Sequence, residues 1–497
     1  MIRTVHHNVW TVQCARLHIG RATALATNDF VRRSPYNDPN SGSKLRASAP
    51  GVDAQWLHVG PRGIGSSDMW AKDMPRINMS NALMASYTSN FIQTAVNPVL
   101  ATRDPSDKQA YVEALVLNET MQDAHIPREC FVISTLIGSN VLQATHNAKP
   151  EERLTKEYVE KGVAMTRQEL DVETVDHVVC QIPEELLARR PEKQREVMDK
   201  LKGTCDVLEA MCDKGTVQSY GFSLPMVVES SQLLEELVDK TLTPLSEQFG
   251  RFASLQLSQH VGSALFPLPE SVMQFRTERE MFFIGDRPLE AMLSSGNPFH
   301  LKTYETMSGE EVALQLKTAF NFAIAVEEKY AKTIRPENEH PDLPSTEEVA
   351  WAHVLANQCS QFDNLQVWIY VRETQIAPRL DATLKQLNKH KETKELGFAY
   401  LMAMKQLLKY FTKSVELEAA ARSTELMAAW KEEKGLLPSD SITIEEVAVM
   451  AALSAGMDIA LLGEQLPASS SLPFTEKFSF GQLQQAARLA KPHFIVA

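Results

Sequence analysis

The stretch that decides the fold is Val175–Phe222, which reads VDHVVCQIPEELLARRPEKQREVMDKLKGTCDVLEAMCDKGTVQSYGF. Short runs rich in β-branched residues at 175–182 and 217–222 predict two strands, and residues 193–214 between them have the apolar spacing of a helix. Strands that are joined through a helix pair in parallel, because the connection has to cross a face of the sheet. This segment therefore predicts an α/β fold with a parallel sheet.

The same alternation of strand and helix continues on both sides, from about Trp56 to His390. Seven or eight such units favour a closed (β/α)₈ barrel over an open doubly wound sheet. No G-x-G-x-x-G follows a predicted strand, which argues against a dinucleotide-binding open sheet. The other predicted strands are Phe91–Thr94, Phe131–Ile137, Ser254–Gln259, Met281–Ile284 and Val367–Val371, and the other predicted helices are Gln109–Met121, Glu152–Glu169 and Gly309–Lys332.

After His390 the pattern is purely helical. Residues 395–430 carry apolar side chains at helical spacing. The sequence Thr443-Ile-Glu-Glu446 is a capping box that predicts a helix over Val447–Leu462, and Ser479-Phe-Gly-Gln482 is a second one. We therefore expect an all-helical extension over residues 391–497.

The amino terminus differs in charge from the rest of the chain. Residues 1–28 contain no acid, and Arg16 and Arg21 mix with apolar residues at helical spacing over Val9–Leu25. This composition is typical of a mitochondrial transit peptide, although an ordinary amphipathic first helix would have the same pattern. Residues 34–53 are rich in Ser, Pro, Asn and Gly and predict a linker. The expected domains are a transit peptide and linker at 1–53, a barrel at 54–390 and a helical extension at 391–497.

Charge and composition narrow the classes of partner. The 50 Lys and Arg residues against 63 Asp and Glu give a net charge of −13, which argues against electrostatic binding of nucleic acid by the protein surface as a whole. Binding through a local basic patch is the remaining alternative. The six cysteines are scattered without zinc spacing, so no metal is expected. The most apolar window, Val447–Gly463, is short and contains Asp458, which predicts a buried helix and no membrane span.

Six phrases, in order along the predicted barrel, resemble the aldo-keto reductases. The resemblance covers residues 56–390 and implies a (β/α)₈ barrel that reduces carbonyl groups with NADPH. The phrases are Asn90–Ala95 (NFIQTA), Phe131–Leu136 (FVISTL), Val175–Pro183 (VDHVVCQIP), Lys214–Ser223 (KGTVQSYGFS), Leu255–His260 (LQLSQH) and Arg287–Leu289 (RPL).

The resemblance also locates the four catalytic positions, which the family fills with Asp, Tyr, Lys and His. In this chain these positions hold Gln93, Pro98, Leu136 and Gln181, respectively. Proline and leucine side chains carry no titratable proton, and the amides of glutamine form hydrogen bonds without transferring protons at neutral pH. The sequence therefore predicts a barrel without the acid–base chemistry of the family, and we expect no catalytic residue at these positions.

The cofactor positions implied by the resemblance are also altered. The amide-binding asparagine is replaced by Leu224, and the aromatic residue that stacks on nicotinamide is replaced by Asp286. The phosphate loop after the eighth strand would fall at Tyr370–Arg372, where bulky side chains obstruct a pyrophosphate. The residues that retain a potential for cofactor contact are Ser223, Gln256 and Arg372.

These observations favour a catalytically inactive barrel that serves as a structural or assembly component of a complex in the mitochondrial matrix. Its expected partners are other proteins of that assembly. No cofactor is expected, although binding of NADP as a vestigial ligand is an alternative. The alternatives are an NADP-dependent oxidoreductase with a rearranged site and a sensor that binds NADP without turnover.

Overall fold

The chain forms two compact units, each of which is described by itself. Among the described residues, the barrel unit holds those up to 289 together with 442–462, and the helical unit holds 290–432. The computed structural model describes residues 20–33, 43–49, 52–65, 89–96, 127–138, 149, 152–170, 172–187, 194–224, 231–258, 268–292, 298–304, 308–337, 340–358, 362, 364–432 and 442–462.

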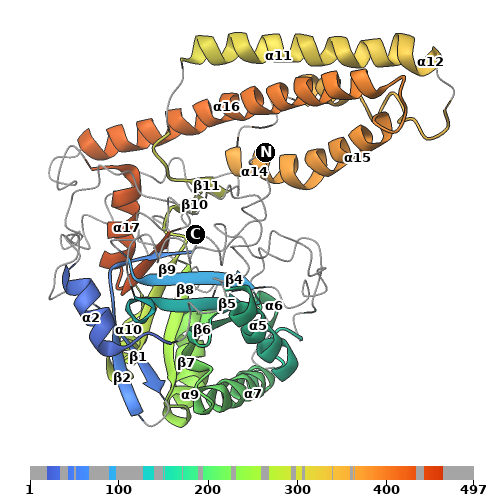
Figure 1. The fold of residues 1–497 in the computed structure, drawn as a ribbon. Coiled ribbons are helices and arrows are strands. Elements are labelled where there is room, and N and C mark those ends of the chain that lie inside the picture. The colour runs from blue at the N-terminus through green and yellow to red at the C-terminus, as the bar shows by residue number, and fades with distance from the viewer. Residues whose placement is uncertain are drawn as a thin grey trace, which may run out of the picture. The chain divides into compact units, whose positions relative to one another are not determined.

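Eight parallel strands close into a barrel, as the sequence predicted, in the order β12-β3-β4-β5-β6-β7-β8-β9. Figure 1 labels β4 to β9 of this barrel. These six strands lie at or within a few residues of the predicted strands. The strands are β3 (Arg62–Ile64), β4 (Phe91–Val96), β5 (Val132–Ile137), β6 (Val175–Gln181), β7 (Val217–Leu224), β8 (Phe252–Ser258), β9 (Phe282–Asp286) and β12 (Ile459–Leu462).

Strands β5, β6 and β7 are buried along their whole length. This burial is expected of parallel strands, because helices cover the outside of the barrel while side chains fill the inside. The elements around the strands are the 3₁₀ helix η4 (Arg128–Cys130), α5 (Lys156–Glu169), α6 (Glu184–Leu187), α7 (Gln194–Asp213), α8 (Ser231–Leu237), the π-helical turn η9 (Val238–Leu242), α9 (Thr243–Gln248), α10 (Glu270–Glu278) and α17 (Ile444–Ser454).

The strand that closes the barrel corrects the sequence analysis. The eighth strand is β12, which pairs in parallel with both β3 and β9, whereas the predicted strand at 367–371 lies in helix α14 (Leu365–Val371). The Asn364 side chain accepts a hydrogen bond from Val367 N (3.0 Å) and caps this helix. The apolar run VWIYV therefore forms a helix, since the cap and tertiary packing outweigh its β-propensity.

The predicted helix over Val447–Leu462 is only partly correct. The capping box at Thr443 is present and opens α17, but the helix ends at Ser454. Gly456 then adopts a φ of 103°, which reverses the chain and leaves Ile459–Leu462 free to form the strand. This strand is only four residues long and follows an apolar helix directly, so its pattern merges with that of the helix.

A β-hairpin covers the amino-terminal end of the barrel. Its strands are β1 (Ser43–Ala49) and β2 (Val52–Val59), which pair antiparallel. Leu45 and Leu57 are fully buried in the same core cluster as Phe91, the first residue of β4. The hairpin thus supplies the apolar layer that seals this end.

The hairpin corrects the expected linker at 34–53. The described part of that stretch, 43–49 and 52–53, is strand, and the expected domain boundary after residue 53 falls inside β2. The alternation of Lys44, Leu45, Arg46 and Ala47 is the two-residue period of a half-buried strand, which the Ser- and Pro-rich composition around it obscured.

Residues of the expected transit peptide also pack onto the barrel. Helix α2 (Ala24–Arg33) contacts β2 and η4, and its Thr27 and Val31 side chains are buried. The hydroxyl of Thr27 accepts a hydrogen bond from the backbone of His58 in β2 (3.1 Å). The segment that begins at Gly20 is therefore part of the folded barrel unit.

Asp176 in β6 fixes this segment to the barrel through a buried network. Its Oδ1 accepts hydrogen bonds from the backbone of Ala22 (2.8 Å) and from Gln218 Nε2 (2.5 Å). Its Oδ2 accepts from the backbone of Ile133 (2.8 Å) and pairs with Arg128 Nη2 (2.8 Å). Four donors from separate parts of the chain thus converge on one carboxylate with no exposed surface.

The helical unit lies between β9 and β12 in the chain, so it is an insertion that begins at residue 290, and not the extension expected from 391. Helices α11 and α16 pack along each other (Figure 1). The elements are β10 (Glu290–Met292), β11 (Pro298–His300), α11 (Gly309–Lys329), η11 (Tyr330–Ile334), α12 (Arg335–Glu337), α13 (Trp351–Gln358), α14, η13 (Arg372–Ile376), α15 (Ala377–Leu387) and α16 (Lys394–Glu432).

An aromatic cluster stabilises the helical unit. The ring of Trp368 lies 4.4 Å from that of Phe411 and 5.1 Å from that of Phe362, measured between centroids. Trp368 is fully buried and donates from Nε1 to Thr412 Oγ1 (2.8 Å). None of the helices described combines the length and apolarity required to cross a membrane.

Candidate functional site

The carboxyl ends of the strands form the end of the barrel where (β/α)₈ proteins carry their active sites. Three of the predicted site residues meet near this end on neighbouring strands, because Gln181 pairs in register with Ser223, and Ser223 with Gln256. All three are buried. Residues in register on adjacent strands share one face of a sheet, so these side chains form a single polar row.

The row faces the inside of the barrel. Gln93 Nε2 on β4 donates a hydrogen bond to Gln256 Oε1 on β8 (2.8 Å), and Ser134 Oγ lies 3.4 Å from the same nitrogen. Strands β4 and β8 lie on opposite sides of the barrel, so this bond crosses its interior. Gln256 Nε2 is buried and has no hydrogen-bond partner among the described residues. The site therefore retains one buried donor that a ligand could satisfy.

Three of the four positions that the resemblance assigns to catalysis lie on the inner face of adjacent strands. Gln93 is on β4, Leu136 on β5 and Gln181 on β6, and each is buried. Leu136 belongs to the apolar core cluster inside the barrel. The fourth position, Pro98, lies outside the described residues. The structure thus brings an apolar side chain and two amides to the place where the family keeps its acid–base groups.

One buried histidine on the inner face was missed by the sequence analysis. His177 Nδ1 lies 2.9 Å from Ser219 Oγ, and its Nε2 lies 2.7 Å from Ser254 Oγ. Burial lowers the pKa of His177 to about 3, so the ring is neutral at physiological pH. Both ring nitrogens are held by serines in the packed interior, which makes this residue a structural element. The signal available in the sequence was that this histidine and the two serines occupy positions on neighbouring strands that face the inside of the barrel.

Tyr158 is a tyrosine near the carboxyl ends of β5 and β6. A Cβ placed on Gly138, which follows β5, would lie 3.9 Å from Tyr158 Cε1. Burial raises the pKa of Tyr158 to about 12. A tyrosine that donates a proton in catalysis needs a lowered pKa, so this environment shifts the hydroxyl in the wrong direction.

Asp286 occupies the position where the resemblance expects a stacking aromatic residue. It ends β9 as a buried residue, and its Oδ2 lies 3.7 Å from Arg287 Nε. Arg287 has a φ of 53°, which is uncommon for a residue with a side chain. Within the described ranges, no group of three or more His, Cys, Asp and Glu residues could hold a metal ion.

The structure does not place Arg372 after the eighth strand, where the resemblance had put it. This residue lies in the π-helical turn η13 of the helical unit, and its Nη1 donates to Thr412 Oγ1 (3.1 Å). The proposed obstruction by Tyr370 and Val371 also falls away, since both belong to α14 and do not follow the eighth strand. The residue after that strand is Gly463, the type that a phosphate loop requires, and it lies outside the described residues.

Two of the comparisons with known proteins found matches. The model of the aldo/keto reductase family matches residues 72–258, which confirms the resemblance found in the sequence for that part of the chain. This segment of the protein is therefore similar to the aldo/keto reductase family. No curated protein matches the chain.

Several solved structures match parts of the chain at low sequence identity. An aldo-keto reductase from Bacillus halodurans in its holo form is 12% identical, with 75% of this chain and 96% of that chain covered and a TM-score of 0.32. An aldo/keto reductase from Klebsiella pneumoniae in complex with NADP and acetate is 14% identical, with 47% and 65% covered and a TM-score of 0.30. A Pseudomonas aeruginosa protein described as an aldo-keto reductase is 14% identical, with 53% and 80% covered and a TM-score of 0.31.

Proposed function

We propose that this protein is a catalytically inactive aldo-keto reductase-like barrel that acts as a structural or assembly component of a mitochondrial complex. The observation that carries the proposal is the set of residues at the catalytic positions, Gln93, Pro98, Leu136 and Gln181. Loss of one acid–base group slows a reaction by about 10²–10⁴-fold. Here all four groups are replaced, and Gln93 is instead hydrogen-bonded to Gln256 inside the barrel.

The helical insertion supports a role in assembly. Its paired helices carry large apolar side chains exposed to solvent, with Leu314 on α11 63% exposed and Phe398 on α16 66% exposed. Phe322 and Met402 on the same two helices are also exposed. Exposed apolar side chains mark a protein-binding surface where they gather into one contiguous patch. We infer that this surface contacts a partner protein in the assembly.

The amino-terminal composition supports import into mitochondria, and the fold limits where a cleaved segment could end. Removal of residues beyond Gly20 would break the hydrogen bond from Ala22 to Asp176 and expose the apolar contacts of Val31. We therefore restrict the proposed transit peptide to residues before Gly20. Arg3 and Arg16 within this segment supply the positive charge that import signals require.

The assembly role predicts that Phe398→Glu will release the protein from its complex. A carboxylate placed in an apolar interface is desolvated without a partner, so we expect the bound share to fall by about tenfold or more. The measurement is a sizing gradient of gently lysed mitochondria that carry the full-length protein. Gln406→Glu adds the same charge at another exposed position of α16 and should leave the distribution unchanged.

The expected wild-type result is a peak far above the 55.6 kDa monomer. A full-length protein that migrates as a monomer or simple dimer would contradict the assembly role. Equal distributions for Phe398→Glu and wild type would show that this surface is not the contact.

A second candidate function is NADP binding, either in an oxidoreductase with a rearranged site or in a sensor. The observation that favours it is the correction of the eighth strand, which is followed in the sequence by Gly463 and not by the bulky Tyr370 and Val371. The unsatisfied Nε2 of Gln256, with Ser223 beside it, fits a ligand that offers a hydrogen-bond acceptor. Turnover of NADPH separates an oxidoreductase from the inactive barrel.

A further inference from the structure

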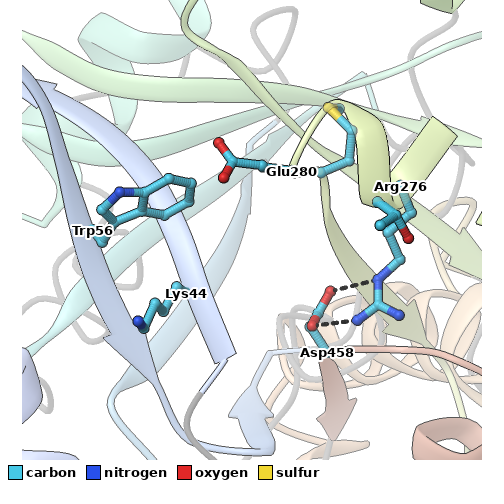
Figure 2. Close-up of a pocket in the computed structure, with 7 residues that line it drawn as sticks. Lys44, Trp56, Arg276, Glu280 and Asp458 are labelled. Atoms are coloured by element: carbon cyan, nitrogen blue, oxygen red, sulfur yellow. Dashed lines mark hydrogen bonds and ion pairs between the residues drawn. The ribbon is translucent and has the colours of Figure 1, made fainter. Parts of the chain in front are cut away.

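A pocket of about 530 Å³ lies at the amino-terminal end of the barrel, away from the strand ends discussed above. Lys44 and Trp56 come from the outer face of the hairpin, and Arg276, Glu280 and Asp458 come from α10, the turn before β9 and the residue before β12 (Figure 2). Active sites of (β/α)₈ proteins lie at the opposite end, so this pocket is separate from the candidate active site.

One side of the pocket shows how the protein binds a guanidinium group of its own. Arg276 Nη2 lies 2.6 Å from Asp458 Oδ1, and its Nε lies 3.3 Å from Asp458 Oδ2. The guanidinium carbon is 5.7 Å from the centroid of the Phe283 ring. Asp458 is further oriented by the backbone of Phe283 (2.8 Å) and the hydroxyl of Ser43 (3.0 Å). A carboxylate and an aromatic ring thus hold one arginine from two sides.

The other side has the same two groups without an arginine. Figure 2 shows the Glu280 carboxylate directed toward the indole ring of Trp56, across the open part of the pocket. No described residue forms an ion pair or hydrogen bond with the Glu280 carboxylate. The ammonium group of Lys44 points away from Glu280 in the same view, so it does not neutralise this carboxylate. Glu280 and Trp56 therefore offer the carboxylate and the ring that Asp458 and Phe283 supply to Arg276.

We propose that Glu280 and Trp56 bind an arginine side chain of a partner protein. Guanidinium groups form charge-assisted hydrogen bonds with carboxylates and stack on aromatic faces, and indole is the strongest such face. The net charge of −13 favours approach of a basic partner. This inference does not rest on the proposed function, because an active barrel would carry the same surface.

The backbone at Glu280 provides a way to separate binding from folding. Glu280 has a φ of 52° and follows the end of α10, while Met281 N donates to Arg276 O (2.9 Å), as in the turn that commonly ends a helix. This left-handed position favours glycine, which adopts it without strain. Glu280→Gly should therefore melt at the same or a higher temperature than wild type while it loses the arginine site.

The experiment is a titration of the full-length protein with a short arginine–glycine peptide, followed by the NMR signal of the Trp56 indole, which Trp56→Phe identifies. We expect this signal to shift and saturate in the millimolar range or below, and to move little with the matched citrulline peptide, which keeps the shape but not the charge. Glu280→Gln should weaken binding about tenfold, as loss of one charged hydrogen bond does.

The control variant is Glu270→Gln at the start of α10, which should bind as wild type does, and raised salt should weaken binding in both. Equal binding of the citrulline peptide would overturn the proposal, as would equal binding by Glu280→Gln. A Trp56 signal that does not move with the arginine peptide would also overturn it.

Discussion

Replacement of Asp176 with alanine is expected to lower the free energy of unfolding by about 3–5 kcal/mol, because it leaves the buried charge of Arg128 without its counter-ion. The side chains of Arg128 and Asp176 are 3% and 0% exposed. The substitution also removes the acceptor for the backbone amides of Ala22 and Ile133. The measurement is urea denaturation of the purified protein, with Asp206→Ala on the exposed face of α7 as the matched control.

The double variant Arg128→Met/Asp176→Leu tests how the network is built. An isolated buried ion pair can be replaced by apolar residues with little loss of stability. Here we expect only partial recovery relative to Asp176→Ala, because the unpaired charge is removed while the amides of Ala22 and Ile133 still lack an acceptor. A loss below about 1 kcal/mol for Asp176→Ala would mean that the network is not essential to the fold, since that is the size of an ordinary substitution.

The second large effect is a pH dependence of stability that arises from His177. Burial lowers its pKa in the folded protein from 6.5 to about 3. Between these values the unfolded chain binds a proton that the folded protein does not, so stability rises with pH in this window. The full contribution of neutral His177 to the free energy of unfolding is present above about pH 6.5. Below that pH it falls by about 1.4 kcal/mol per pH unit as the solution is made more acidic.

His177→Gln removes this titration and keeps a neutral side chain that can both donate and accept toward Ser219 and Ser254. From pH 7.5 to pH 5, wild type should lose about 2 kcal/mol more of its unfolding free energy than the variant does. Urea denaturation at the two pH values measures this difference. Parallel pH profiles for the two proteins would show that His177 takes up its proton as readily in the fold as in the unfolded chain.

Most of the barrel could be predicted because its strands have a strong local pattern. Strands β4 to β9 are apolar runs separated by longer helical segments. The first and eighth strands, Arg62–Ile64 and Ile459–Leu462, are too short to produce such a pattern. The run at Val367–Val371 has high β-propensity, yet tertiary packing of Trp368 on Phe411 places it in a helix. Local secondary-structure preference was therefore a poor guide at positions where packing between distant segments of the chain determines the structure.

The site was predictable to the extent that it depends on strand order. Gln181, Ser223 and Gln256 were placed on consecutive strands from their phrases, and register brings them together. The hydrogen bond between Gln93 and Gln256 joins residues 163 positions apart and depends on closure of the barrel, which no local pattern encodes. The expected position of Arg372 after the eighth strand was wrong for the same reason, because the eighth strand itself was misplaced.

We propose that the barrel does not reduce carbonyl groups, and NADPH oxidation tests this proposal most directly. The purified full-length protein is incubated with NADPH and a panel of aldehydes and quinones, and absorbance of the reduced nicotinamide is followed over time. We expect no oxidation above that of heat-inactivated protein, since Gln93, Leu136 and Gln181 supply no acid that could protonate the carbonyl oxygen. Carbonyl-dependent oxidation that Gln256→Leu abolishes would contradict it and establish the barrel as an enzyme with a rearranged site.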